Sequence, residues 1–252
     1  MDVISYDDID FSKLNRLSSK EGACAALYSE KRFKHSMYKL YNDPLLTECK
    51  NKEKKLELFS RVNDIDSLSK TTCLIKDNNH HVGYISKYIN GTNLGDLQES
   101  CDIFSILPIL LNISADLRKL HFLDQNIVVG DLHFDNIIID KSGKHYFVDV
   151  DSYGIKDFRP DNLPTTLYSY CDYMNYPIKY SKNSDKLSFL LNTFSFIFSK
   201  NFVNISEKEF DCNSELLPFL KDMKELFLDL KSSYSEIPDV PYLDEVVKVK
   251  KI

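Results

Sequence analysis

Apolar and polar residues alternate in short runs over the first third of the chain, and turn-forming residues separate these runs. A period of two is typical of β-strands. It predicts strands over residues 23–29, 35–41, 71–77 and 81–89. One charged segment, residues 46–62, interrupts them and has the spacing of a helix. We therefore expect the first part of the chain to form a small β-sheet with one helix.

The pattern changes after residue 104. Apolar residues then recur at helical spacing, which predicts a long core helix over residues 105–124, with Pro108 near its first turn. A two-stranded hairpin is expected at 136–151, followed by an irregular Tyr- and Pro-rich stretch. Further helices are expected at 184–200, at 214–231 and near the C-terminus.

These elements define an α+β chain with two lobes. The first, residues 1–90, is rich in strands, and the second, residues 91–252, is mainly helical. Asn, Gly and Thr cluster near residues 90–96, where we place the connection. Because ligand sites commonly form between such units, a cleft between the lobes is the expected binding site.

Composition excludes several classes of protein. The 38 acidic residues outnumber the 32 basic ones, giving a net charge of −6, which argues against nucleic acid as the main partner. The six cysteines form no CxxC pair and the acidic N-terminus lacks the features of a secretory signal, so we expect a reducing, cytoplasmic location. The longest apolar runs are shorter than the roughly 20 residues of a membrane span, which argues against integral membrane association.

The predicted hairpin carries polar residues that a plain hairpin core would not need. If Ser142-Gly143 form a two-residue turn, the strand register places Asn136 opposite Asp149. Asp151 would overshoot by two residues, roughly 7 Å, so we keep it as the alternative. Amide and carboxylate oxygens that leave room for water and phosphate are the ligands that Mg²⁺ prefers. Asn136 and Asp149 are thus the predicted metal ligands.

Asp131 lies on the loop that enters this hairpin. There it could orient or deprotonate an attacking hydroxyl while a metal ion neutralises a transferring phosphoryl group. This arrangement indicates phosphoryl transfer.

The string GDLHFDN, followed by the hairpin and Asp149-Val150-Asp151, resembles the protein-kinase-like superfamily. It is closer to the GDxHxxN loop of aminoglycoside-phosphotransferase-like and other atypical kinases than to the HRDLKxxN loop of typical protein kinases. The resemblance covers about residues 14–200 and implies a bilobal kinase fold that uses ATP and Mg²⁺. It also implies catalytic roles for Asp131 and Lys39, which lies on the predicted strand 35–41.

Other positions follow from the same resemblance. Glu53 is expected to pair with Lys39, with Glu57 one helical turn away as the alternative. Asp185 would brace the catalytic loop from below. Ser86 would be the gatekeeper of the hinge, where the backbone of Lys87 and Ile89 would bind the adenine edge.

The pattern departs from the family in several places. The phosphate loop contains only Gly22, where several glycines are usual. Val129 and Gly130 stand where typical kinases carry His and Arg, so activation by loop phosphorylation is not predicted. His133 replaces the usual Lys after the catalytic Asp. Residues 152–182 resemble an activation segment, and the chain after residue 200 is shorter than the family's usual set of late helices.

Three functions follow. The first is an ATP- and Mg²⁺-dependent kinase acting on a protein Ser or Thr hydroxyl. The second is a small-molecule kinase, which the GDLH motif favours. The third is a nucleotide-binding pseudokinase that acts as an interaction module, suggested by the glycine-poor loop.

Overall fold

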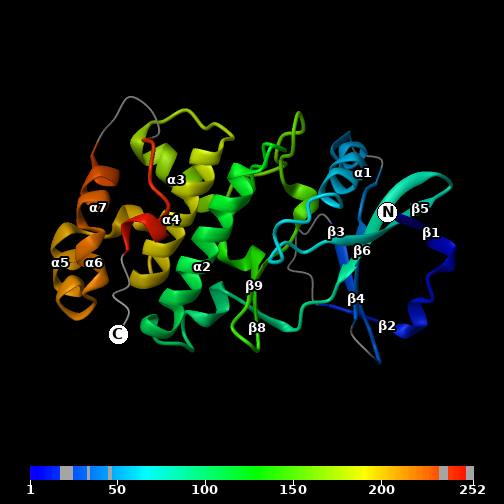
Figure 1. The fold of residues 1–252 in the computed structure, drawn as a ribbon, viewed down its shortest axis with the longest axis horizontal. Helices are drawn as coiled ribbons and strands as arrows, with labels where there is room; N and C mark the ends of the chain where they lie inside the picture. Colours follow the sequence, from blue (N-terminus) through cyan, green and yellow to red (C-terminus); the bar gives the residue numbers. More distant parts are fainter. Residues whose placement is uncertain (18–24, 33–34, 45–46, 233–237, 248–252) are drawn as a thin grey trace.

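The computed structural model of the protein describes residues 1–17, 25–32, 35–44, 47–232 and 238–247. Figure 1 shows an elongated molecule with a β-sheet at one end and most helices at the other. The N-terminus lies at the sheet end and the C-terminus at the helical end. The predicted α+β class is confirmed at this level.

Six strands of the described chain form one sheet in the order β1-β5-β6-β4-β3-β2. β1 is parallel to β5, and the other neighbours are antiparallel. The hydropathy pattern misses β1 and β2 because runs of four and three residues are too short to show a period. The other four strands agree with the predicted ones. The bounds are β1 (Asp2–Ser5), β2 (Leu14–Arg16), β3 (Ala25–Glu30), β4 (Ser36–Tyr41), β5 (Thr71–Asp77) and β6 (His80–Lys87).

The helices agree with the predicted ones in outline. The helical region predicted at 214–231 begins earlier, at Glu207, and is divided near Pro218 and again at Met223. Helix α3 lies in the stretch that the sequence predicted to be irregular. None of the helices in the described residues combines the length and apolarity that a bilayer span requires. The bounds are α1 (Thr47–Phe59), α2 (Ile103–Phe122), α3 (Thr165–Met174), α4 (Lys182–Phe198), α5 (Glu207–Leu216), α6 (Phe219–Asp222), α7 (Lys224–Lys231) and α8 (Leu243–Val246).

The long helix α2 lies in the main core. Leu110, Leu117 and Leu120 are fully buried on one of its faces, as the helical spacing predicted. The Asp102 side chain caps its N-terminus by accepting hydrogen bonds from two backbone N–H groups. Pro108 lies inside the helix rather than in its first turn, on an exposed position of the second turn.

A second sheet, β7-β8-β9, lies between the sheet end and the helical end of the molecule (Figure 1). It consists of β7 (Gly91–Asn93), β8 (Ile137–Asp140) and β9 (His145–Phe147). The predicted hairpin is present, but its predicted register is wrong by one residue, because Ile137 pairs with Phe147 and the backbone of Asn136 bonds Val148. The cause is a three-residue loop in which Gly143 has φ +83° and the Asp140 carboxylate binds the loop N–H groups.

Candidate functional site

Lys39 enters the site from the central strand β4. Neighbouring residues of a strand point to opposite faces of the sheet, so Tyr38 and Lys39 face different environments. The Lys39 ammonium binds the carboxylates of Asp149 and Asp151, the latter at 2.8 Å. A lysine of the first sheet and two aspartates more than a hundred residues later thus form one cluster.

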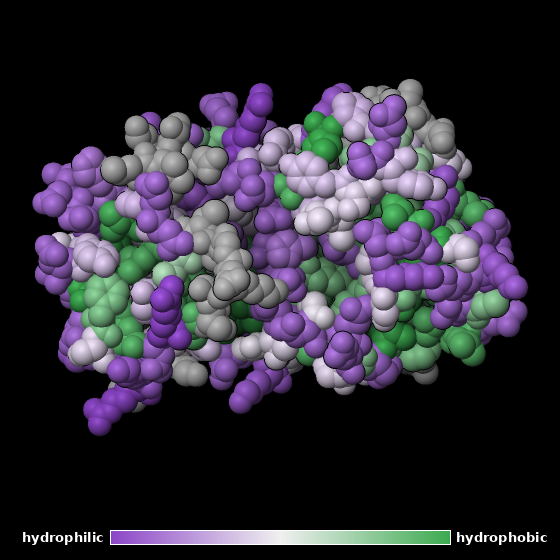
Figure 2. Space-filling model, turned by 180° about the vertical axis from the view of Figure 1, so that it is seen from behind, coloured by the Kyte–Doolittle hydropathy of each residue, from purple (hydrophilic) through white to green (hydrophobic). Residues whose placement is uncertain are grey.

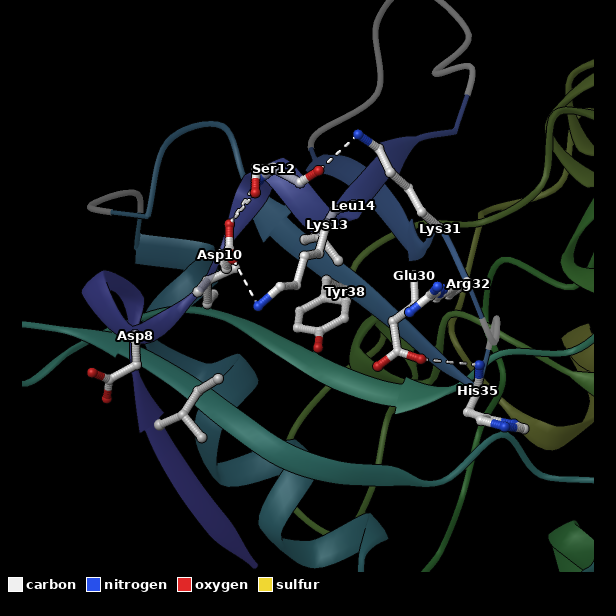
Figure 3. A pocket seen from close by; sticks show the side chains of 12 residues that line it. Asp8, Asp10, Ser12, Lys13, Leu14, Glu30, Lys31, Arg32, His35 and Tyr38 are labelled. Carbon is white, nitrogen blue, oxygen red and sulfur yellow. Dashed lines mark hydrogen bonds and ion pairs between the residues drawn. The ribbon is translucent and has the colours of Figure 1, made fainter.

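Tyr38 faces a different cavity, of about 900 Å³, on the outer side of the sheet. Figure 3 shows Tyr38 beneath Leu14, with Lys13, Glu30 and Arg32 around it. This cavity contains none of the residues that the sequence predicted for the site. The face of the molecule seen in Figure 2 is mainly hydrophilic, with apolar patches toward both ends.

Asp151 is the most enclosed member of the Lys39 cluster, with a side-chain exposure of 0%. Its Oδ1 accepts from Lys39 at 2.8 Å and from the Tyr84 hydroxyl at 2.9 Å. Its Oδ2 accepts from Lys52 at 3.0 Å and from the Tyr41 hydroxyl at 3.2 Å. Burial by itself would raise the pKa of Asp151, but the charges of Lys39 and Lys52 outweigh it and hold the pKa below its usual value.

The Lys39 ammonium stays charged because the two carboxylates stabilise its positive charge. Burial by itself lowers its pKa, whereas the charges of Asp149 and Asp151 raise it and prevail, so that the pKa lies above the ordinary lysine value.

Helix α1 supplies lysines to this cluster, not a glutamate. Lys52 and Lys55 lie on the buried face of the helix together with Leu56 and Phe59, as their three- and four-residue spacing requires. Lys52 binds Asp161 at 2.8 Å as well as Asp151, and Lys55 binds Asp161 at 2.5 Å.

The predicted pair between Lys39 and Glu53 is therefore wrong. Glu53 points away from the cluster and binds Lys76 of β5 at 2.6 Å, and the alternative, Glu57, is exposed. Successive helix positions are about 100° apart. When Lys52 faces the core, Glu53 therefore projects from the flank of the helix and not into the cluster. The signal that could have found the lysines is that Lys52 stands four residues before the buried Leu56.

The backbone just before Asp131 is held by hydrogen bonds to a side chain of α4. The Asp185 carboxylate accepts from the backbone N–H of Val129 at 2.6 Å and of Gly130 at 2.8 Å, and it is fully buried. The His121 ring binds the same carboxylate at 3.0 Å. This is the contact that the resemblance implied for Asp185, and α4 provides it.

Asp131 itself faces a partly open space, with a side-chain exposure of 23%. Burial is the main cause that raises its pKa above the usual value, and the charge of Asp149 raises it further, whereas His133 lowers it. The His133 ring lies 3.8 Å from the Asp131 carboxylate. The two carboxylates of Asp131 and Asp149 are thus close enough to interact electrostatically.

Asn136 and Asp149 offer oxygen atoms next to this loop. The Asn136 amide donates its N–H to the carbonyl of Asp131 at 3.0 Å, so its side-chain oxygen is turned away from that bond. Asp149 has left-handed backbone angles, φ 64° and ψ 35°, and its side chain is 34% exposed. Because only Oδ1 of Asp149 binds Lys39 among the described residues, the other carboxylate oxygen is open.

This donor set fits Mg²⁺, which accepts a few protein oxygens and retains water. A complete cage would not be needed. Among the described residues, no group of three or more His, Cys, Asp or Glu is arranged to hold a metal ion, so Asn136 and Asp149 would share the ion with phosphate and water.

Three of the remaining predicted residues lie at the end of β6 and just after it. Ser86 is buried near the end of β6, Lys87 is the last residue of that strand, and Ile89 follows in the connection to β7. This connection is where the sequence placed the hinge. Gly22 lies outside the described residues.

The segment after Asp151 packs against the loop that carries Asp131. A Cβ at Gly130, which has φ +76°, would collide with the ring of Pro160 and approach the carbonyl of Asn162 at 2.8 Å. This close packing requires glycine at position 130. Further along, Asn175 ends α3 with left-handed backbone angles, and Tyr176 is buried.

No known protein-family model matches this chain, and no curated protein sequence matches it.

Proposed function

We propose that the protein is an ATP- and Mg²⁺-dependent phosphotransferase with the two-lobed arrangement of the protein-kinase-like superfamily, and that its acceptor is a Ser or Thr hydroxyl of a protein. The observation that carries this proposal is the meeting of Lys39 with Asp149 beside the loop of Asp131 and Asn136. These four groups come from three segments, β4, the loop of Asp131 and Asn136, and the residues after β9, and they have the chemistry of phosphoryl transfer.

Each group has a defined part in the proposed reaction. Lys39 binds the α- and β-phosphates, and Asn136 and Asp149 hold Mg²⁺, which neutralises charge on the phosphoryl oxygens when it is bound. Asp131 orients the acceptor hydroxyl and accepts its proton. The acceptor oxygen forms a bond to the γ-phosphorus while the bond from this phosphorus to the β–γ bridging oxygen breaks, giving ADP and a phosphate ester.

A small-molecule acceptor is the second candidate. It is favoured by a polar pocket of about 350 Å³ beside the catalytic loop, lined by His133, Asp135, Asn192 and Ser195 among others. A pocket of this size suits a compact polar ligand. The protein acceptor remains our main proposal, because residues 152–182 follow the pattern of an activation segment.

The test is transfer of label from γ-labelled ATP. Purified protein is incubated with Mg²⁺ and, in separate reactions, with itself, a protein extract and a panel of small alcohols. We expect label on protein, and loss of at least about 10³-fold in kcat for Asp131→Asn without loss of fold. Label only on a small alcohol would favour the second candidate.

Absence of transfer in every reaction, with equal results for wild type and Asp131→Asn, would overturn both. A thermal shift with ATP that does not depend on Mg²⁺ would then indicate a nucleotide-binding pseudokinase.

A further inference from the structure

The two carboxylates that bind Lys39 differ in what else they can do. Asp149 is partly exposed and keeps one oxygen open. Asp151 is fully buried, and each of its oxygens already accepts one lysine ammonium and one tyrosine hydroxyl. An ionised carboxylate has about four lone-pair sites in total, so the four donors to Asp151 leave it no site for a metal ion.

This occupancy separates the roles of the two aspartates. Asp149 can exchange its contact with Lys39 for another partner, whereas Asp151 is fixed by groups of the protein itself. A lysine that binds phosphates needs a permanent anion to hold its ammonium in place. Among the described residues, Asp151 is the only fully buried carboxylate that binds Lys39.

Helix α1 is tied to this anion through its own cations. Lys52 bridges Asp151 at 3.0 Å and Asp161 at 2.8 Å, and Lys55 adds a second bond to Asp161. Displacement of α1 would remove Lys52 from Asp151 and leave a buried carboxylate with one cation less, which is costly. The position of α1 and that of Asp151 are thus physically linked.

We propose that Asp151 is the positioning residue for Lys39 and that Lys52 of α1 holds Asp151 in place. The helix then acts on the phosphate-binding lysine through an aspartate of the loop after β9, not through a glutamate of its own. This inference rests on the function proposed above. It makes Lys52 and Asp151 a coupled pair in catalysis.

The experiment compares five variants in the labelled-ATP assay: Asp151→Asn, Lys52→Met, the double variant, Lys52→Arg and Glu53→Gln. Asp151→Asn is expected to lower kcat/KM for ATP by at least about tenfold, and Lys52→Met by about five- to tenfold. Glu53→Gln removes the same charge as Asp151→Asn from the outer side of α1, and should change kcat/KM by less than about twofold.

The double variant tests the coupling. If Lys52 acts through Asp151, adding Lys52→Met to Asp151→Asn causes little further loss, whereas independent structural roles would multiply the two losses. The double variant also restores the charge balance, so it serves as the folded sample if Asp151→Asn alone does not fold. Lys52→Arg, which keeps the cation, should retain activity within about threefold.

A second readout does not depend on turnover. Acetylation of Lys39 at a fixed pH, measured by mass spectrometry, should be at least about fivefold faster in Asp151→Asn than in wild type, because the neutral Asn no longer holds the ammonium. Acetylation of Lys76, which binds Glu53, should be unchanged and serves as the internal control.

The outcomes separate the two proposals. Wild-type protein that transfers no label overturns the proposed function and, with it, a catalytic role for this pair. Active wild type with unaltered kinetics in Asp151→Asn, or a loss in Glu53→Gln as large as that in Asp151→Asn, overturns the positioning role alone.

Discussion

The carboxylate of Asp185 accepts a hydrogen bond from the backbone N–H of Gly130 at 2.8 Å, deep in the protein and next to the residue proposed as the catalytic base. The same carboxylate holds Val129 and the His121 ring. A single buried side chain of α4 therefore sets the path of the loop that presents Asp131.

Replacing Asp185 with Asn should destabilise the fold and disturb the loop. The Asn amide can accept with only one atom and turns N–H groups toward backbone donors, leaving at least one buried donor unpaired. We expect a loss of about 2–4 kcal/mol in the free energy of unfolding, measured by urea denaturation. Asp239→Asn, which removes an exposed partner of Lys186, is the control and should cost less than about 0.5 kcal/mol. Equal losses would contradict the role given to Asp185.

Two glycines with positive φ provide a test of the packing behind the loop of Asp131. Gly130 has φ +76° and lies against Pro160, whereas Gly143 has φ +83° and no neighbouring atom within 4 Å of the position that a Cβ would take. Replacing Gly143 with Ala should cost only the left-handed backbone strain, about 1–2 kcal/mol. Gly130→Ala adds the collision and should cost at least about 1 kcal/mol more. Thermal unfolding of both variants gives the comparison, and a smaller loss at Gly130 would refute this packing.

The proposed base should show its altered environment in the pH profile. Because burial and the charge of Asp149 raise the pKa of Asp131, the acid limb of kcat/KM should lie above the pH of about 3.9 expected for an ordinary aspartate. The charge of His133 lowers the pKa of Asp131. His133→Gln should thus move the limb to higher pH. Carbon NMR titration of the Asp131 carboxyl measures the same pKa independently. An acid limb that moved to lower pH in His133→Gln would contradict the effect assigned to His133.

Asp151 should make stability depend on acid. Its pKa is lower in the folded protein than in the unfolded chain, so its stabilising contribution is complete above about pH 4 and is lost as the pH falls toward the folded value. The difference in free energy of unfolding between wild type and Asp151→Asn should therefore be constant from about pH 5 to 8 and shrink below about pH 4. Guanidinium titrations at each pH measure it. A difference that grew with acid would contradict the burial of an ionised Asp151.

Local patterns were sufficient for much of the fold. Period-two runs predicted β3 to β6, and helical spacing predicted α1, α2 and α4, because the side that faces the core must be apolar whatever the partner is. The order of polar residues in GDLHFDN and the following hairpin likewise identified Asp131, Asn136 and Asp149 as neighbours.

Tertiary structure decided which groups meet. The sequence offered Glu53 and Lys52 at adjacent positions of one helix, and only the packing of Leu56 and Phe59 into the core selected Lys52 for the inner face. Likewise, one extra residue in the loop closed by Gly143 moved the hairpin register and set Val148 opposite Asn136. Periodicity fixes which residues share a face, whereas the rotation of a helix, the length of a turn and the partner of a buried charge depend on contacts between segments far apart in the chain.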